Sequence, residues 1–140
     1  MKRLVLLSAV VLFTALTFTS CSSDDDPGED LMELDANDIL KTMAGTTWSV
    51  RWSIASTSSN EHESWKESWT FLDNNTLIVS GSEDGEKYTD EYTYAFRTTN
   101  GNLYFVLDHS SIYEVEVLKS KSFRFFANNR FETETISGSR

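Results

Sequence analysis

From Gly45 onward, hydrophobic and polar residues alternate along most of the chain with a period of two, which is typical of β-strands buried on one face. About eight such stretches follow one another. In the last of them, the pattern places Phe131, Thr133 and Thr135 inside, opposite Glu132 and Glu134. The predicted apolar faces lie within 48–54, 65–71, 76–80, 88–96, 103–107, 113–117, 123–125 and 131–135.

The breaks between these stretches are mostly short and rich in Asn, Asp, Gly and Ser, as in 73–75, 99–102 and 128–129. Connections of hairpin length force neighbouring strands to run antiparallel, so the chain should meander. Eight meandering strands with one apolar face can close into an up-and-down barrel, which removes exposed sheet edges. The predicted fold is therefore an all-β, eight-stranded antiparallel barrel.

One short helix is predicted before the strands, over 35–45. Asp35 is suited to the N-cap, and Gly45 marks the end of the helix. Ile39, Leu40 and Met43 form an apolar stripe at helical spacing.

The first residues predict an exported lipoprotein. Lys2 and Arg3 precede an apolar run, 4–18, that is too short for an ordinary membrane span, and small residues then lead to Cys21. This junction resembles the lipobox of bacterial lipoproteins, with Phe18 where the family usually has Leu. It implies a signal peptide over 1–20 and acyl chains on Cys21. The alternative is an ordinary signal peptide that leaves Cys21 as a free thiol.

The acidic segment 22–26 resembles the export signal of surface-exposed lipoproteins of the Bacteroidota, which implies display at the outer membrane. We expect 21–34 to be a flexible acidic tether, because it has too little apolar surface to fold, and 35–140 to be one domain. The formal net charge of −10 argues against nucleic-acid binding, since phosphate contacts need clustered cations. Membrane attachment should come from the lipid alone.

Several short segments together resemble the small lipocalin-like domains of Bacteroidota lipoproteins. They are Gly45 to Trp48, the aromatic strand and polar turn 69–75, 92–94 leading to 100–103, and 113–115 before a final aromatic pair of strands. Two residues separate Gly45 from Trp48, whereas lipocalins have one. The family also closes an Arg over this Trp, and Arg124 and Arg130 are the candidates here. The resemblance implies a lipocalin-like barrel with a possible internal pocket.

The inward faces predict where a ligand would bind. Trp48, Trp52, Trp65 and Trp69 should form two same-face pairs on adjacent strands. Glu67 and Asp90 fall on aromatic faces, where a carboxylate could orient an amine or hydroxyl. The alternative is that the aromatic residues simply fill the barrel. The predicted pocket wall consists of Trp48, Trp52, Trp65, Glu67, Trp69, Asp90, Tyr92, Tyr94, Phe105 and Tyr113.

We predict no catalytic residues, no metal site and no cofactor, because no known motif for such chemistry occurs. His62 and His109 should lie on the rim opposite the helix, among acidic loop residues. This rim is either a mouth for a cation or partner or a set of solvated loops. It should face outward, with the helix and tether toward the membrane.

The sequence thus predicts a lipid-anchored surface lipoprotein, not an enzyme, that binds a small apolar or amphipathic molecule. The alternative is a protein- or glycan-interaction module with a filled barrel, which would act through its acidic rim or its outer sheet.

Overall fold

The computed structural model describes residues 28–140, and within them the predicted closed antiparallel barrel with one short helix is confirmed. The predicted features of 1–27, including the signal peptide and Cys21, lie outside the described residues. The elements are α2 (Ala36–Met43), β1 (Thr46–Ser56), β2 (His62–Phe71), β3 (Thr76–Glu83), β4 (Glu86–Thr99), β5 (Asn102–Leu107), β6 (Ser111–Leu118), β7 (Ser122–Asn128) and β8 (Glu132–Ser139).

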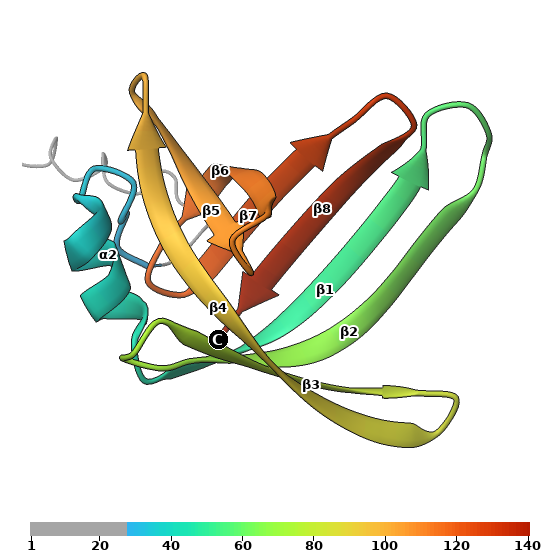
Figure 1. Cartoon of the computed structure of the whole chain (residues 1–140), viewed down its shortest axis with the longest axis horizontal. Helices are drawn as coiled ribbons and strands as arrows, with labels where there is room; N and C mark the ends of the chain where they lie inside the picture. Colours follow the sequence, from blue (N-terminus) through green and yellow to red (C-terminus); the bar gives the residue numbers. More distant parts are fainter. Residues whose placement is uncertain (1–27) are drawn as a thin grey trace, which may run out of the picture.

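Each strand pairs with the next one in sequence, and β8 closes the barrel by pairing with β1 (Figure 1). The register sets Trp48 opposite Trp69 and Trp52 opposite Trp65, as the alternation predicts. The two pairs differ in their packing. The rings of Trp52 and Trp65 stack at 5.5 Å, whereas Trp48 packs on Phe123 at 5.0 Å.

Helix α2 lies at one end of the barrel, against β4 (Figure 1). The carboxylate of Asp35 accepts hydrogen bonds from the backbone N–H groups of Asn37 and Asp38, which are otherwise unpaired in a first helical turn. Ile39 and Met43 are fully buried, so the predicted stripe seals this end of the core.

Of the predicted tether over 21–34, the structure describes 28–34, and part of this segment contacts the barrel instead of extending freely, whereas 21–27 lie outside the described residues. The backbone of Asp30 forms an isolated antiparallel β-bridge with Lys119, and the Leu31 N–H donates to the Leu118 carbonyl at 2.9 Å. The Leu31 side chain is buried. Burial of the Leu31 side chain and these backbone hydrogen bonds stabilise the contact of this segment with the β6–β7 connection.

The half of the barrel near α2 is filled by aromatic side chains. Phe105, Phe125 and Phe123 form a stack with centroid spacings of 4.4 and 4.5 Å, and Trp69 and Phe71 pack at its edge. In this half, the interpretation that the aromatic residues fill the barrel is right.

Arg140 packs over Trp48, with its guanidinium carbon 5.0 Å from the ring centroid. The two candidates for this position, Arg124 and Arg130, were therefore wrong. Arg124 lies beside Glu116, and Arg130 lies over Phe131. Arg140 follows β8, so it reaches Trp48 near the start of β1 at the point where the barrel closes.

The predicted inward face of the last strand was inverted. In β8, Ile136 and Gly138 are buried and Glu134 lines the interior, whereas Phe131 precedes the strand and is 67% exposed. Gly138 leaves room for the ring of Phe123, which lies where a Cβ atom would be. In β6, a bulge between Val115 and Val117 turns Leu118, rather than Val117, into the core.

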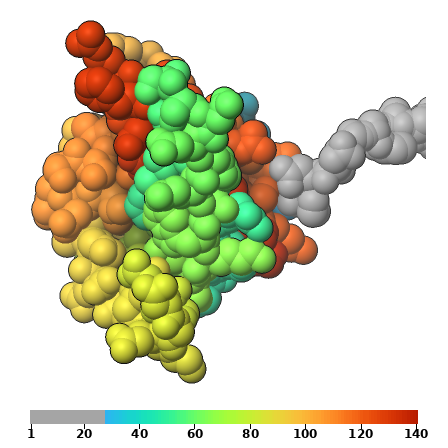
Figure 2. Space-filling view, turned by 90° about the vertical axis from the view of Figure 1, so that its right-hand side faces the viewer, coloured from blue at the N-terminus to red at the C-terminus, as the bar shows by residue number. Residues whose placement is uncertain are grey.

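At the end opposite α2, the hairpins diverge (Figure 1). Pairing of β2 with β3 runs only over 67–71 of β2, and pairing of β4 with β5 only over 94–99 of β4. Figure 2 looks onto this end, where the hairpins β1–β2 in green, β3–β4 in yellow and β7–β8 in red form separate lobes. The barrel is thus solid near the helix and open at this mouth.

Candidate functional site

A cavity of about 290 Å³ opens in the mouth of the barrel, at the low end of the size range of small-molecule sites. It lies between the filled half of the barrel and the diverging hairpins. Its walls are aromatic and aliphatic, with two carboxylates among them. The lining residues are Trp52, Ile54, Glu67, Val79, Tyr88, Tyr92, Leu107, Ser111, Tyr113 and Glu134.

The Glu67 carboxylate is held by three donors. Its Oε1 accepts from Trp65 Nε1 at 2.8 Å and from the Tyr88 hydroxyl at 2.9 Å, and its Oε2 accepts from Trp69 Nε1 at 2.7 Å. The two tryptophans are neighbours of Glu67 on one face of β2, as the strand period requires. Hydrogen bonds to indole and phenol groups replace part of the water that a half-buried carboxylate loses.

Tyr88 reaches Glu67 because its cross-strand neighbour is Gly81. The tyrosine ring lies where a Cβ atom of residue 81 would be. Partial burial, together with the hydrogen bond to Glu67, raises the pKa of the Tyr88 hydroxyl to about 12. Tyr88 therefore stays a donor to Glu67 at physiological pH.

A second carboxylate, Glu134, faces the cavity from β8. Its Oε2 accepts a hydrogen bond from the Tyr113 hydroxyl at 3.0 Å. Burial raises the pKa of Tyr113, and the neighbouring charge of Glu134 adds to the effect. Burial also raises the pKa of Tyr92, and the charges of Asp90 and Glu67 add to it.

Trp52 forms a wall between these two carboxylates. Its ring stacks on Trp65 and meets the edges of Trp69 and Tyr113 at 6.0 and 6.2 Å. Its indole N–H is buried and has no hydrogen-bond partner within residues 28–140. An unpaired buried donor costs free energy, so this N–H lowers the stability of the wall.

The structure divides the predicted pocket residues into three groups. The first group, which lines the cavity, consists of Trp52, Glu67, Tyr92 and Tyr113. Trp65 does not line the cavity, but it donates a hydrogen bond to Glu67 and lines an adjoining hollow. Trp48, Trp69, Tyr94 and Phe105 are 0–3% exposed and belong to the filled core. Asp90 is exposed and does not line the cavity, because β4 has left the barrel wall at this position.

Six of the lining residues were not predicted for the site, and two of them, Tyr88 and Glu134, carry its polar chemistry; the other four are Ile54, Val79, Leu107 and Ser111. Tyr88 shares its strand face with Tyr92, so the alternation that selected Tyr92 could have found it. Glu134 was assigned to the outer face, and its inward position follows from the register of Glu134 with Ile54 of β1.

The predicted rim residues do not converge on one site. His62 lines a shallow hollow with Glu61, Glu63 and Glu132, and His109 does not line that hollow. Within residues 28–140, no group of three His, Cys, Asp or Glu side chains is arranged to hold a metal ion.

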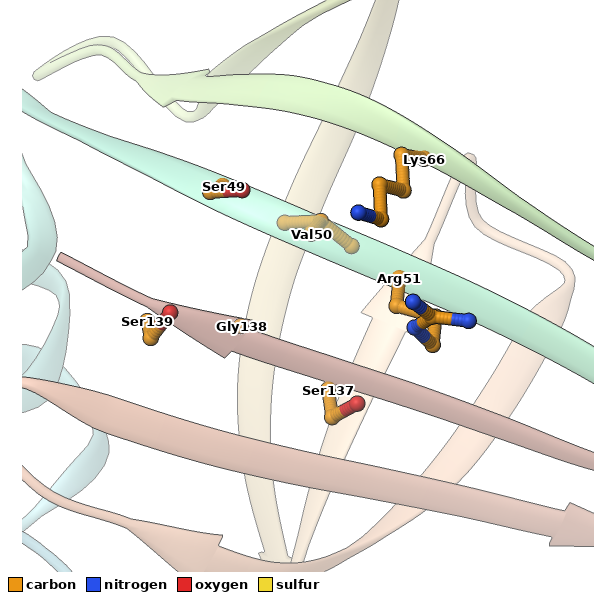
Figure 3. Close-up of a pocket in the computed structure, with 7 residues that line it drawn as sticks. All are labelled: Ser49, Val50, Arg51, Lys66, Ser137, Gly138 and Ser139. Atoms are coloured by element: carbon orange, nitrogen blue, oxygen red, sulfur yellow. The ribbon is translucent and has the colours of Figure 1, made fainter.

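A separate hollow of about 330 Å³ lies on the outer face of β1, β2 and β8 (Figure 3). Arg51 and Lys66 are register partners there, and Ser137 lies opposite Arg51 on β8. Figure 3 shows the side chains of Arg51 and Lys66 next to each other on neighbouring strands, with Ser49 farther along β1 and Ser137 and Ser139 on β8. The hollow exists because the residues beside Arg51 and Lys66 are small: Ser49, Ser137, Gly138 and Ser139.

Comparisons of the chain with protein-family models, with curated proteins and with solved structures each found no match. In the part of the chain that the structure describes, no helix is long and apolar enough to cross a membrane.

Proposed function

We propose that this chain is a surface lipoprotein of the outer membrane, anchored by acyl chains on Cys21, and that its barrel mouth binds a small amphipathic molecule. The observation that carries the binding proposal is the cavity itself. It has an aromatic wall and two carboxylates held in place by hydrogen bonds, a combination that suits the binding of a ligand with one apolar part and one polar part.

The volume of the cavity limits the size of the ligand. About 290 Å³ accommodates a small ring system or a short chain, not a long acyl tail. Because Phe105, Phe125 and Trp69 fill the barrel below it, a ligand cannot extend toward α2 without displacing them. The ligand should therefore enter and leave through the mouth.

Intrinsic fluorescence tests this proposal, since Trp52 lines the cavity and stacks on Trp65. Small amphipathic compounds with a ring or short chain should change the emission saturably. Tyr92→Ala should weaken this response, while Tyr104→Ala, on another strand and away from the lining, should not. Unchanged emission across positively charged, neutral and negatively charged compounds would contradict the proposal.

One observation favours the alternative of an interaction module. The row Lys66, Arg51, Ser137 and Arg124 crosses four adjacent strands on the outer face of an otherwise acidic protein. Such a row would suit an acidic glycan. Salt-dependent retention on a sulfated polysaccharide column, abolished in Arg51→Ala/Lys66→Ala but not in Lys87→Ala, would support this second function.

A further inference from the structure

We infer that the ligand of the barrel mouth is an organic cation: a protonated or quaternary amine attached to a small apolar or aromatic body. This inference rests on the proposed binding function and names the chemical class of the ligand.

The lining of the cavity carries a net negative charge. The cavity contains Glu67 and Glu134 and no Lys, Arg or His. Asp90, Glu83 and Asp108 lie near enough to act on the tyrosines of the wall, and all three carry the same sign. No ion pair within residues 28–140 neutralises Glu67 or Glu134. The field in the mouth thus attracts a cation and repels the carboxylate of a fatty acid.

The two carboxylates also differ in their remaining capacity to accept hydrogen bonds. A carboxylate offers about four acceptor positions. Glu67 uses three of them for Trp65, Trp69 and Tyr88, and Glu134 uses one for Tyr113. Most of the free capacity is therefore on Glu134, which can accept from an ammonium group while Tyr113 holds it in place.

The aromatic wall also suits a cation. Trp52, Tyr88, Tyr92 and Tyr113 surround the same space as the two carboxylates. The negative faces of such rings stabilise ammonium groups, including quaternary ones that have no N–H to donate.

Calorimetric titration with three probes that share one ring tests the inference. These are 2-phenylethylamine, 2-phenylethanol and phenylacetate, which are positive, neutral and negative at neutral pH. The amine should bind at least tenfold more tightly than the alcohol, and phenylacetate should not bind.

Glu134→Gln keeps an acceptor for Tyr113, so it should weaken amine binding about tenfold and leave alcohol binding unchanged. Glu132→Gln, an exposed change on the same strand, is the matched control.

The outcomes separate the two proposals. If the alcohol or phenylacetate binds as tightly as the amine, or if Glu134→Gln leaves amine affinity unchanged, the cation inference is wrong and the binding function stands. If none of the three probes binds, and benzyltrimethylammonium does not bind either, both proposals fail. An unfolding curve for each variant shows whether its fold is retained.

Discussion

At the scale of single residues, Glu67 connects the core of the barrel to its mouth. Of its three donors, Trp69 is fully buried, while Trp65 and Tyr88 lie at the open end. The indole N–H of Trp69 is buried, and Glu67 is its acceptor. Glu67 therefore has a structural role besides any contact with a ligand.

We expect Glu67→Ala to lower the free energy of unfolding by about 1–3 kcal/mol, because it leaves a buried donor without its acceptor. Urea unfolding followed by tryptophan fluorescence measures this change. Glu63→Ala, at an exposed position of the same strand, should have no measurable effect. Equal unfolding midpoints for the two variants would show that the hydrogen bonds to Glu67 add nothing to stability.

We expect the protein to lose stability at alkaline pH, because the pKa values of buried tyrosine hydroxyls are raised. The pKa values of Tyr88 and Tyr94 are both raised from 10 to about 12, in each case mainly by burial. The folded state thus holds these protons more tightly than the unfolded chain does. This contribution to stability is complete below pH 10 and is lost as the pH rises from 10 through about 12.

Phenolate absorbance against pH, in buffer and in urea, measures this effect. The native curve should lie at higher pH than the unfolded one. Tyr94→Phe should remove one of the late-titrating groups, because this side chain is buried and donates to the Leu72 carbonyl. Coincident native and unfolded curves would refute the prediction.

The same residues show how far sequence reasoning extends. The strand period alone placed Glu67 between two tryptophans, and the structure confirms that position. The same period also placed Asp90 on the pocket wall, and there the prediction was wrong, because Asp90 is exposed and does not line the cavity. A short side chain on a strand that has left the barrel wall faces solvent, whereas the longer Tyr88 and Tyr92 still reach the mouth. Where a strand leaves the wall depends on pairing across the sheet, which the pattern of one strand does not contain.

At the scale of elements, the helix and the strands were predictable because each had strong local signals. Which face of β8 points inward was not predictable from its sequence. Its inward positions are Glu134, Ile136 and Gly138, and only one of these has an apolar side chain. Glu134 lies in the open mouth, and Gly138 gives way to Phe123 from the neighbouring strand. Both exceptions arise from partners on other strands.

Arg140 lies where β8 closes the barrel against β1, and we expect it to stabilise this closure. Arg140 lies over Trp48 of β1 and also donates from Nε to the Ser120 carbonyl at 2.7 Å, in the β6–β7 connection. It therefore ties three parts of this end together. Arg140→Ala should lower the free energy of unfolding by about 1 kcal/mol, the usual contribution of a cation–π contact of this kind.

Arg130→Ala is the matched control, because its guanidinium lies over Phe131, which is 67% exposed. It should leave the urea midpoint unchanged. A similar loss in both variants would mean that the contact with Trp48 contributes nothing specific.

At the scale of the whole molecule, the two ends of the barrel differ in what they carry. Gly28 to Leu31, α2 and the end of β8 gather at the filled end, and the cavity opens at the other (Figure 1). If Cys21 carries acyl chains, as we propose, the seven residue steps to Gly28 span at most roughly 25 Å. The filled end should therefore lie nearer the bilayer, with the mouth directed away from it.

Energy transfer to a dye confined to the bilayer tests this orientation in the lipidated protein on vesicles. A donor dye on Asn74→Cys, in the β2–β3 turn beside α2, should transfer more strongly than one on Asn60→Cys, in the β1–β2 loop at the mouth. Cys21→Ser provides the control for attachment, because without acyl chains neither position should approach the bilayer. Equal transfer from the two positions would mean that the barrel lies on its side. Stronger transfer from Asn60→Cys would mean that the mouth faces the membrane, and a ligand would then have to enter from the lipid surface.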